Sequence, residues 1–372
     1  MQLSNDLQQS SPPQMAEKSR PPARVIAIIP AHNEEIGIAQ TIDSLRRQTQ
    51  SPDRILVAAD NCTDGTVDIA KAMGVEVLET WENTAKKAGA LNQALATVLP
   101  CLQPSDVVLM MDADSRLNHD FVAAGMAYFK HWPMRGGISG SYVAADHPSN
   151  VALLQKIEYT QGLRTVHRRA GRIHVLSGAA TMFTVEALRK VADMRGSNVI
   201  PGEKGLVYDE CSLTEDYELT VALKRVGFDP RCAIDCVVVT DVMPTWHEWM
   251  IQRLRWQRGT LETLFTYGFV EHTRKAWAVQ TWTYFRTIIP LLTLMTWVYA
   301  LTFEGVAFYP IWLLAIPVFM LDQLLATWNA GPKARIYATL IVPLWVYETY
   351  QSVVYWKALR LALQGGEKEW LT

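Results

Sequence analysis

The chain has 372 residues and a formal net charge of -2, so its overall charge gives no reason to expect nucleic acid as a partner. Charged residues make up 19% of the chain, and the apolar residues concentrate after about residue 276. This asymmetry predicts a soluble domain followed by a membrane-associated region.

Residues 1–23 are rich in Gln, Ser and Pro and contain no apolar run. Such a segment cannot bury enough surface to offset the entropy of ordering, so we expect a disordered tail. It also lacks the apolar core of a signal peptide, which predicts that the following domain is cytoplasmic.

From Arg24 onward, short apolar runs alternate with helical patterns. The runs at 24–30, 54–60, 75–80 and 106–114 predict strands, and the segments 34–48, 66–74 and 85–99 predict helices. Strands that alternate with helices indicate βαβ units, and therefore an α/β domain with a mostly parallel sheet. We expect this domain to cover residues 24–245.

Polar clusters follow three of the predicted strands: PAHNEE (30–35), ADNCTDGT (59–66) and MDADS (111–115). Ligands of open α/β sheets bind beyond the carboxyl ends of the strands, so these clusters are expected to share one rim and one site. No GxGxxG follows the first strand, which argues against a dinucleotide-dependent dehydrogenase.

Asp112 and Asp114 stand two residues apart at a strand end, a spacing that points both carboxylates the same way. Hard divalent cations such as Mg²⁺ or Mn²⁺ prefer oxygen ligands, so the pair is a candidate metal site. The alternative is a solvated turn in which Asp is simply a turn-forming residue.

The segment LTEDYEL predicts a helix start with Thr214 as its N-cap. Glu215 and Asp216 then lie in the first turn, where they either complement the helix dipole or supply a general base.

Residues 246–276 begin with WHEWMIQRLRWQRG, which predicts a helix with Gln252, Arg255, Trp256 and Gly259 on one face. Amide, guanidinium and indole groups together suit a diphosphate and a sugar. The other interpretation is a helix lying on lipid headgroups, anchored by Trp246, Trp249 and Trp256.

Three apolar stretches follow, at 287–303, 306–327 and 336–356, each close to the length that spans a bilayer. They predict membrane helices over 277–360 with a tail at 361–372, and the distribution of Lys and Arg favours a cytoplasmic catalytic domain. The third stretch contains Glu348 and Gln351, so it is the candidate for an interfacial or re-entrant segment. Buried helices of a soluble protein are the alternative.

The ordered set PAHNEE, ADNCTDGT, KKAGALN, MDADS, LSGAATMF, LTEDYEL and QRLRW resembles the inverting, membrane-bound family-2 glycosyltransferases of GT-A fold. This family includes cellulose, hyaluronan and poly-N-acetylglucosamine synthases and ceramide glucosyltransferases. The resemblance runs from about residue 24 to residue 260, with the membrane region following as in the family.

The resemblance implies a nucleotide-sugar donor, most simply a UDP-sugar, and a role for each matching residue. Base and ribose would be held by Ala31, His32, Glu34 and Asp60, and Lys87 would lie near the base or diphosphate. Asp112 would contact the donor, and Asp114 would ligate Mg²⁺ or Mn²⁺.

For the acceptor side, the resemblance implies that Ser177 and Gly178 belong to the wall of the site. Asp216 would be the general base, with Glu215 shaping its surroundings. The remaining motif residues, Gln252, Arg255 and Trp256, would hold the diphosphate and stack on the acceptor sugar.

Some segments depart from the family pattern. His32 stands where the family often has Tyr, the second loop lacks a double Asp, and residues 195–209 look like a local extension. The basic stretch 163–175 is either a site for an anionic lipid or a solvated basic face.

The acceptor is left open by the sequence: a lipid-linked, polysaccharide or protein acceptor each fits. A single transfer and processive polysaccharide synthesis are both compatible with QxxRW. A non-catalytic nucleotide-sugar sensor at the membrane would be expected to lack the acidic set that is present here.

Overall fold

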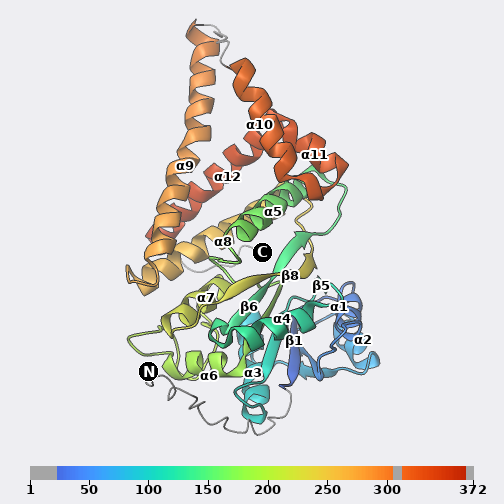
Figure 1. Cartoon of the computed structure of the whole chain (residues 1–372). Coiled ribbons are helices and arrows are strands. Elements are labelled where there is room, and N and C mark those ends of the chain that lie inside the picture. The colour runs from blue at the N-terminus through green and yellow to red at the C-terminus, as the bar shows by residue number, and fades with distance from the viewer. Residues whose placement is uncertain (1–22, 305–311, 366–372) are drawn as a thin grey trace, which may run out of the picture.

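The computed structural model describes residues 23–304 and 312–365, and its centre is an eight-stranded sheet with the order β3-β2-β1-β4-β7-β6-β8-β5 (Figure 1). The strands are β1 (Val25–Ala31), β2 (Arg54–Ala59), β3 (Glu76–Glu79), β4 (Val107–Met111), β5 (Arg116–Leu117), β6 (Gly137–Ala144), β7 (Ala180–Thr184) and β8 (Arg231–Thr240).

Strands β3, β2, β1 and β4 are parallel to one another, whereas β7 runs antiparallel to both β4 and β6. The first four predicted strands and the helices between them are all present, so the α/β class with a mostly parallel sheet is confirmed. The helices of the domain are α1 (Ile38–Arg46), α2 (Thr66–Ala72), α3 (Lys86–Val98), α4 (Phe121–His131), α5 (Asn150–Arg168), α6 (Val185–Met194) and α7 (Glu215–Arg225).

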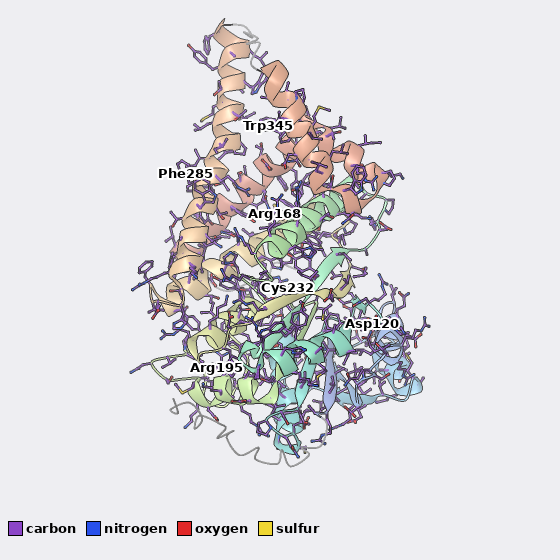
Figure 2. All side chains as sticks on the ribbon, viewed as in Figure 1. Asp120, Arg168, Arg195, Cys232, Phe285 and Trp345 are labelled. Atoms are coloured by element: carbon purple, nitrogen blue, oxygen red, sulfur yellow. The ribbon has the colours of Figure 1, made fainter. Side chains whose placement is uncertain are left out.

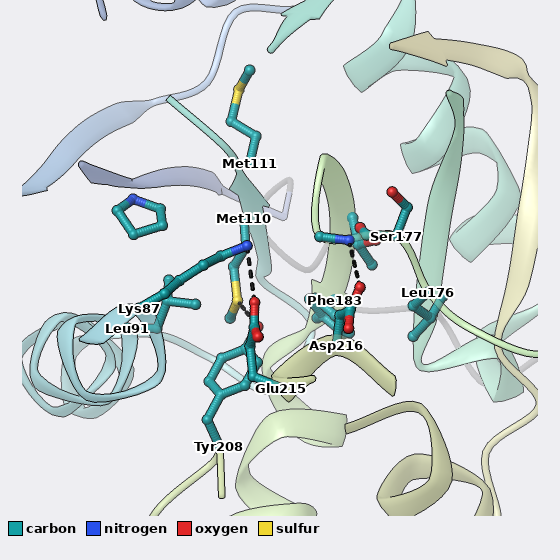
Figure 3. Close-up of a pocket in the computed structure, with 13 residues that line it drawn as sticks. Lys87, Leu91, Met110, Met111, Leu176, Ser177, Phe183, Tyr208, Glu215 and Asp216 are labelled. Carbon is teal, nitrogen blue, oxygen red and sulfur yellow. Dashed lines mark hydrogen bonds and ion pairs between the residues drawn. The ribbon is translucent and has the colours of Figure 1, made fainter. Parts of the chain in front are cut away.

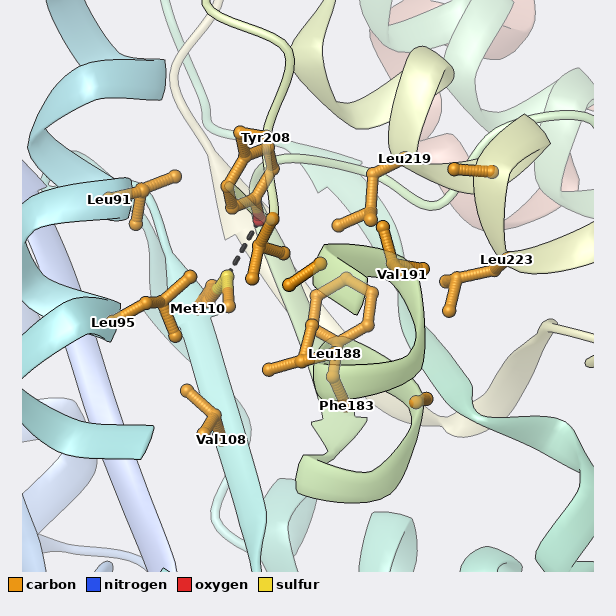
Figure 4. Packing of buried hydrophobic residues seen from close by; sticks show 14 of the residues in the cluster. Leu91, Leu95, Val108, Met110, Phe183, Leu188, Val191, Tyr208, Leu219 and Leu223 are labelled. Atoms are coloured by element: carbon orange, nitrogen blue, oxygen red, sulfur yellow. Dashed lines mark hydrogen bonds between the residues drawn. The ribbon is translucent and has the colours of Figure 1, made fainter. Parts of the chain in front are cut away.

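Helices cover both faces of the sheet, and β4 shows why. Its residues alternate between two apolar clusters: Val108 and Met110 pack on one face, and Val107, Leu109 and Met111 on the other. Figure 4 shows the first cluster, where side chains of α3, α6 and α7 meet β4. A central strand buried on both faces reads as a continuous apolar run, which is the pattern of VVLMM.

The predicted extension at 195–209 is an ordered strap held by a buried cation (Figure 2). The Arg195 guanidinium donates to both carboxylate oxygens of Glu218 on α7, at 2.8 and 2.9 Å, and to the Leu206 carbonyl at 3.0 Å. Both side chains of this ion pair are almost fully buried. The strap is therefore fastened to the helix that carries Asp216.

The C-terminal helices are α8 (Trp246–Tyr267), α9 (Arg274–Tyr299), α10 (Trp312–Ala326), α11 (Pro332–Thr339) and α12 (Ile341–Gln364). In Figure 1, α9 and α10 rise away from the sheet domain, while α8 and α12 lie between them and the sheet. The π-helical turn η3 (Ala300–Glu304) continues α9.

Within the described residues, one helix, Arg274–Phe303, is long and apolar enough to cross a membrane, and only 6% of its apolar window is buried. Side chains such as that of Phe285 project outward from it (Figure 2). The second predicted stretch lies partly outside the described residues and retains a shorter apolar helix, Ala315–Ala326. The third is divided between α11 and α12, because the chain is extended at Leu340.

The alternative interpretation of residues 246–276 made Trp249 one of the anchors on lipid, and for this residue the structure rules it out. Its side chain is completely buried, and its indole N–H donates to the Tyr347 hydroxyl on α12 at 2.8 Å. A tryptophan that faces another helix has no surface left for lipid. Trp246 packs edge-on against Trp249 and Tyr350 but stays partly exposed.

Candidate active site

A cavity of about 510 Å³ lies at the carboxyl end of β4, between the sheet domain and α8, and we call it the catalytic cavity. It brings together residues that are up to 193 positions apart in the chain, from Lys87 to Gln280, since α3, α7, α8 and α9 all contribute to its wall. Of the residues singled out from the sequence, it is lined by Lys87, Asp112, Asp114, Ser177, Gly178, Glu215, Asp216, Gln252, Arg255 and Trp256.

One cation joins three parts of this site. The Lys87 ammonium on α3 lies 2.5 Å from an oxygen of Asp112. It also lies 3.0 Å from an oxygen of Glu215 (Figure 3). Burial alone would lower the pKa of Lys87, but the two carboxylates outweigh it and hold that pKa well above its usual value. Lys87 therefore stays charged and fixes the start of α7 against β4.

Glu215 and Asp216 are neighbours with opposite electrostatics. Burial would raise the pKa of Glu215, but the Lys87 and Arg255 charges overcome it and keep that pKa below normal. Burial, and then the Glu215 charge, raises the pKa of Asp216 to about 6. Two carboxyl groups with pKa values pushed apart are the usual sign of divided roles. Asp216 is the one poised to exchange a proton near neutral pH.

The Asp216 carboxylate is oriented by backbone groups. Its Oδ2 accepts a hydrogen bond from the Gly178 N–H at 3.2 Å (Figure 3). Its Oδ1 accepts one from the Tyr217 N–H at 2.7 Å. A Cβ at Gly178 would lie 2.9 Å from the Lys87 nitrogen. Glycine is therefore what allows the chain before β7 to approach this close.

Thr214 precedes α7 as predicted, but its expected capping hydrogen bond is absent. The Thr214 hydroxyl is buried and has no hydrogen-bond partner. Gly259 of α8 packs directly against it: a Cβ added at Gly259 would lie only 2.6 Å from the hydroxyl oxygen. Gly259 was predicted on the same face of the helix as Gln252, Arg255 and Trp256, and in the structure it lets α8 pack on the start of α7.

Negative charge accumulates beside Asp112 on the other side of the cavity. Burial, followed by the Asp112 charge, raises the pKa of Asp114 to about 6. Burial and the charges of Asp114 and Asp112 raise the pKa of Glu34 to about 7. Asp241, directly after β8, adds to both shifts and also lines the cavity. Asp241 was not predicted as a site residue, although it directly follows the apolar run 237–240, as Asp112 follows β4.

Asp112 and Asp114 could bind a divalent cation only if a bound ligand supplied the remaining coordinating oxygens. Oxygen donors at a strand end are what Mg²⁺ and Mn²⁺ prefer. Within 23–304 and 312–365, however, no three His, Cys, Asp or Glu side chains converge as a metal site. Lys87 already holds one oxygen of Asp112, which leaves Asp114 as the main protein ligand available. A donor diphosphate would have to complete the coordination.

The residues expected to hold base and ribose form a second group beside the catalytic cavity. The Asp60 carboxylate is buried and accepts hydrogen bonds from Thr80 at 2.8 Å and Asn83 at 2.7 Å. His32 Nδ1 lies 2.6 Å from the Asp60 carbonyl, and the Asp60 N–H donates to the Ala31 carbonyl. Asp60 thus organises the ends of β1 and β2, and its side chain is already engaged within the protein.

The predicted face of α8 looks into the cavity. Arg255 donates to the Leu213 carbonyl at 3.1 Å, and the Gln252 carbonyl oxygen is buried with no partner, as expected of a group that awaits a ligand. Behind them lies Arg253, which the sequence analysis missed. Its guanidinium sits 4.5 Å from the Trp256 ring centre and 2.6 Å from a Glu158 oxygen.

Residues 26–192 match the family described as Glycosyl transferase family 2. The fold is GT-A: the structure resembles the mannosyltransferase PcManGT from Pyrobaculum calidifontis, solved with GDP-Man and Mn²⁺. That likeness has a TM-score of 0.60 at 17% identity, over 92% of this chain and 88% of the other.

The chain is also similar in sequence to two proteins that are named as a polysaccharide synthase and a probable glycosyltransferase. The poly-beta-1,6-N-acetyl-D-glucosamine synthase of Staphylococcus aureus strain COL is 23% identical over 247 residues, 64% of this chain and 54% of the relative. The probable glycosyltransferase YdaM of Bacillus subtilis is 27% identical over 256 residues, 66% of this chain and 57% of the relative. The match thus spans little more than half the length of each relative.

Proposed function

We propose that the protein is an inverting glycosyltransferase that moves a sugar from a nucleotide donor, a UDP-sugar, to a membrane-associated acceptor at the cytoplasmic face. The observation that carries this proposal is the position of Asp216. Its carboxyl group, with a pKa of about 6, faces the same cavity as Asp112, Asp114, Arg255 and Trp256.

The chemistry proposed is a single displacement. An acceptor hydroxyl attacks the anomeric carbon and forms the new C–O bond, while the bond from that carbon to the diphosphate oxygen breaks. Asp216 takes the hydroxyl proton, and one displacement inverts the anomeric configuration. The positive charges of Lys87 and Arg255 offset the charge on the leaving diphosphate. Glu215 keeps Lys87 in place through the 3.0 Å ion pair.

In this proposal Ala31, His32, Glu34 and Asp60 border the base and ribose. Asp114, with Asp112, would hold a Mg²⁺ or Mn²⁺ ion that neutralises diphosphate charge when bound. On the acceptor side, Ser177 and Gly178 form the wall and Trp256 stacks on the sugar, with Gln252 hydrogen-bonded to donor or acceptor.

The membrane arrangement belongs to the same proposal. We assign residues 24–245 to the catalytic domain, 246–276 to the helices that carry QxxRW, 277–360 to a multi-pass membrane region, and 1–23 and 361–372 to tails. The exposed apolar surface of α9 and α10 supports attachment to a bilayer.

The test is release of UDP from a panel of UDP-sugars by the full chain in mild detergent, with Mn²⁺ or Mg²⁺. Wild type is compared with Asp114→Asn and Asp216→Asn. Turnover of one donor that both substitutions abolish would support the proposal. Wild-type protein that binds donors with metal but never turns over, even with membrane extract as the acceptor source, would refute it in favour of a sensor.

A processive polysaccharide synthase is the second candidate, favoured by the similarity to the staphylococcal synthase. The size of the product distinguishes the two: a ladder in mass spectrometry indicates processive extension, and one added sugar indicates a single transfer. GDP-sugars form the next donor panel if no UDP-sugar is used.

A further inference from the structure

A second cavity, of about 290 Å³, adjoins the catalytic cavity beneath α5, and we call it the α5 cavity. The two cavities share Tyr142, Tyr159, His174 and Val175 in their walls. Tyr142 and Tyr159 meet edge to face at 5.0 Å and form part of this common boundary. The α5 cavity therefore lies directly beside the cavity that holds Asp216, with these rings between them.

The wall of the α5 cavity is mostly apolar, and the basic residues at its rim are exposed to solvent. Leu163, Val166 and Ile173 supply hydrocarbon surface, and Arg169 and Arg172 lie at the edge. Its volume corresponds to about ten water molecules, at ~30 Å³ each. A polysaccharide would leave its hydroxyl groups unpaired against such a surface, whereas a hydrocarbon chain would not.

The basic rim lacks compensating acids. Among the residues that the structure describes, Arg168, Arg169 and Arg172 form no ion pair with any Asp or Glu. Arg169 Nη1 instead donates a hydrogen bond to His174 Nε2 at 3.3 Å, and His174 lines both cavities. The Arg169 charge at this junction is not compensated by an acid and is available to bind an anionic group.

The cavity also lies on the membrane side of the catalytic domain. Helix α5 packs against α10 and α11, and Gln161 on α5 donates to Gln323 on α10 at 2.7 Å. In Figure 1, α5 lies between the sheet and the C-terminal helices. Arg168, the last residue of α5, appears above Cys232 in Figure 2, and Cys232 lines the cavity. A chain leaving the α5 cavity is therefore close to the apolar helices.

Gly162 is a second, independent observation about the α5 cavity, because the absence of a side chain there leaves room for a ligand. It stands within α5, where glycine costs ~1 kcal/mol relative to alanine. A Cβ at Gly162 would meet no atom within 4 Å, so no contact within the protein requires glycine. Gly162 nevertheless lines the cavity, where a side chain would take up ligand space.

We propose that the acceptor is an anionic glycolipid, whose sugar hydroxyl lies at Asp216, whose phosphate lies at Arg169 and His174, and whose hydrocarbon chain enters the α5 cavity. This assignment rests on the proposed transferase function and names the substrate class for it. Trp256, which also lines the catalytic cavity, then stacks on the sugar that carries the hydroxyl.

The experiment uses the full chain in discs of neutral phosphatidylcholine and a dodecyl phosphate that carries a photoreactive diazirine. Cross-linked peptides are identified by mass spectrometry, with the corresponding dodecyl alcohol as the uncharged control. Gly162→Leu fills the cavity, Arg169→Gln removes one rim charge, and Arg168→Gln is the matched control, because Arg168 does not line the cavity.

The phosphate probe is expected to label peptides from α5 and residues 169–175. Labelling should fall about tenfold in Arg169→Gln, the effect of losing one charged hydrogen bond, and comparably in Gly162→Leu, and persist in Arg168→Gln. Equal labelling by the alcohol, or labelling that survives both cavity variants, would overturn the proposal. So would competition by phosphatidylglycerol added to the discs, which would indicate an ordinary headgroup site.

UDP release is measured on the same samples to keep the two proposals apart. Wild-type protein that turns over no donor counts against the transferase function itself. Variants that still release UDP to water have kept the donor site folded, so their loss of labelling tests the acceptor assignment alone.

Discussion

Replacing Asp216 by Asn should abolish transfer and at the same time stabilise the protein. The pKa of Asp216 is about 6 in the folded protein against an unperturbed 3.8. Between these two pH values the folded state holds a proton that the unfolded state has released, so stability falls as pH rises through this range. Because a pKa change of one is worth ~1.36 kcal/mol, the ionised carboxylate costs up to about 3 kcal/mol above pH 7.

Asparagine removes that cost because it does not ionise. Its amide oxygen can keep only one of the two hydrogen bonds that Asp216 accepts, from the Gly178 and the Tyr217 N–H, and losing the other costs about 1 kcal/mol, less than the cost removed. The melting temperature of Asp216→Asn should therefore exceed that of wild type at pH 8, with the gain vanishing near pH 4. Thermal unfolding in detergent, followed by tryptophan fluorescence, measures both points.

Activity should change in the opposite direction. Loss of a general base lowers turnover by about 100- to 10,000-fold. In wild type, kcat/KM should rise with pH and level off above about pH 6, where Asp216 is ionised. A variant that is destabilised equally at pH 4 and pH 8, or a wild-type profile that is flat from pH 5 to pH 8, would contradict this account of Asp216.

Three further outcomes follow from other contacts. Gly178→Ala would place a Cβ 2.9 Å from the Lys87 nitrogen, so UDP release should fall about ten- to a hundredfold with little change in melting temperature; unchanged turnover would show that this close approach is not needed. Arg195→Met leaves the buried Glu218 carboxylate without its cation and should lower the free energy of unfolding by about 3–5 kcal/mol. The double variant Arg195→Met/Glu218→Gln should recover most of that loss. If the double variant instead loses the sum of the two single losses, the Arg195–Glu218 ion pair does not stabilise the fold. Chelation of divalent metal should abolish turnover until Mn²⁺ or Mg²⁺ is returned, and calorimetry should show UDP binding weakened without metal and in Asp114→Asn; turnover that persists in chelator would exclude the metal site.

The local patterns in the sequence were sufficient for the first half of the fold. Apolar runs such as 24–30 and 106–111 could only be buried strands, and the helical spacing of Ile38, Ile42 and Leu45 placed α1. The rule that ligands bind at strand ends then put Asp112 and Asp114 at the rim. These features depend on residues close together in the chain, and for that reason the sequence alone predicts them.

What only the tertiary structure decided are the contacts between distant segments. Lys87 meets Glu215 across 128 positions, Arg253 lies behind Trp256 with its partner Glu158 on α5, and Trp249 faces α12 rather than lipid. The α5 cavity likewise exists only because α5 closes over β6. A periodic pattern in the sequence cannot predict such contacts, because each depends on how whole helices pack. These long-range contacts set both the pKa of Asp216 and the shape of the acceptor side of the site.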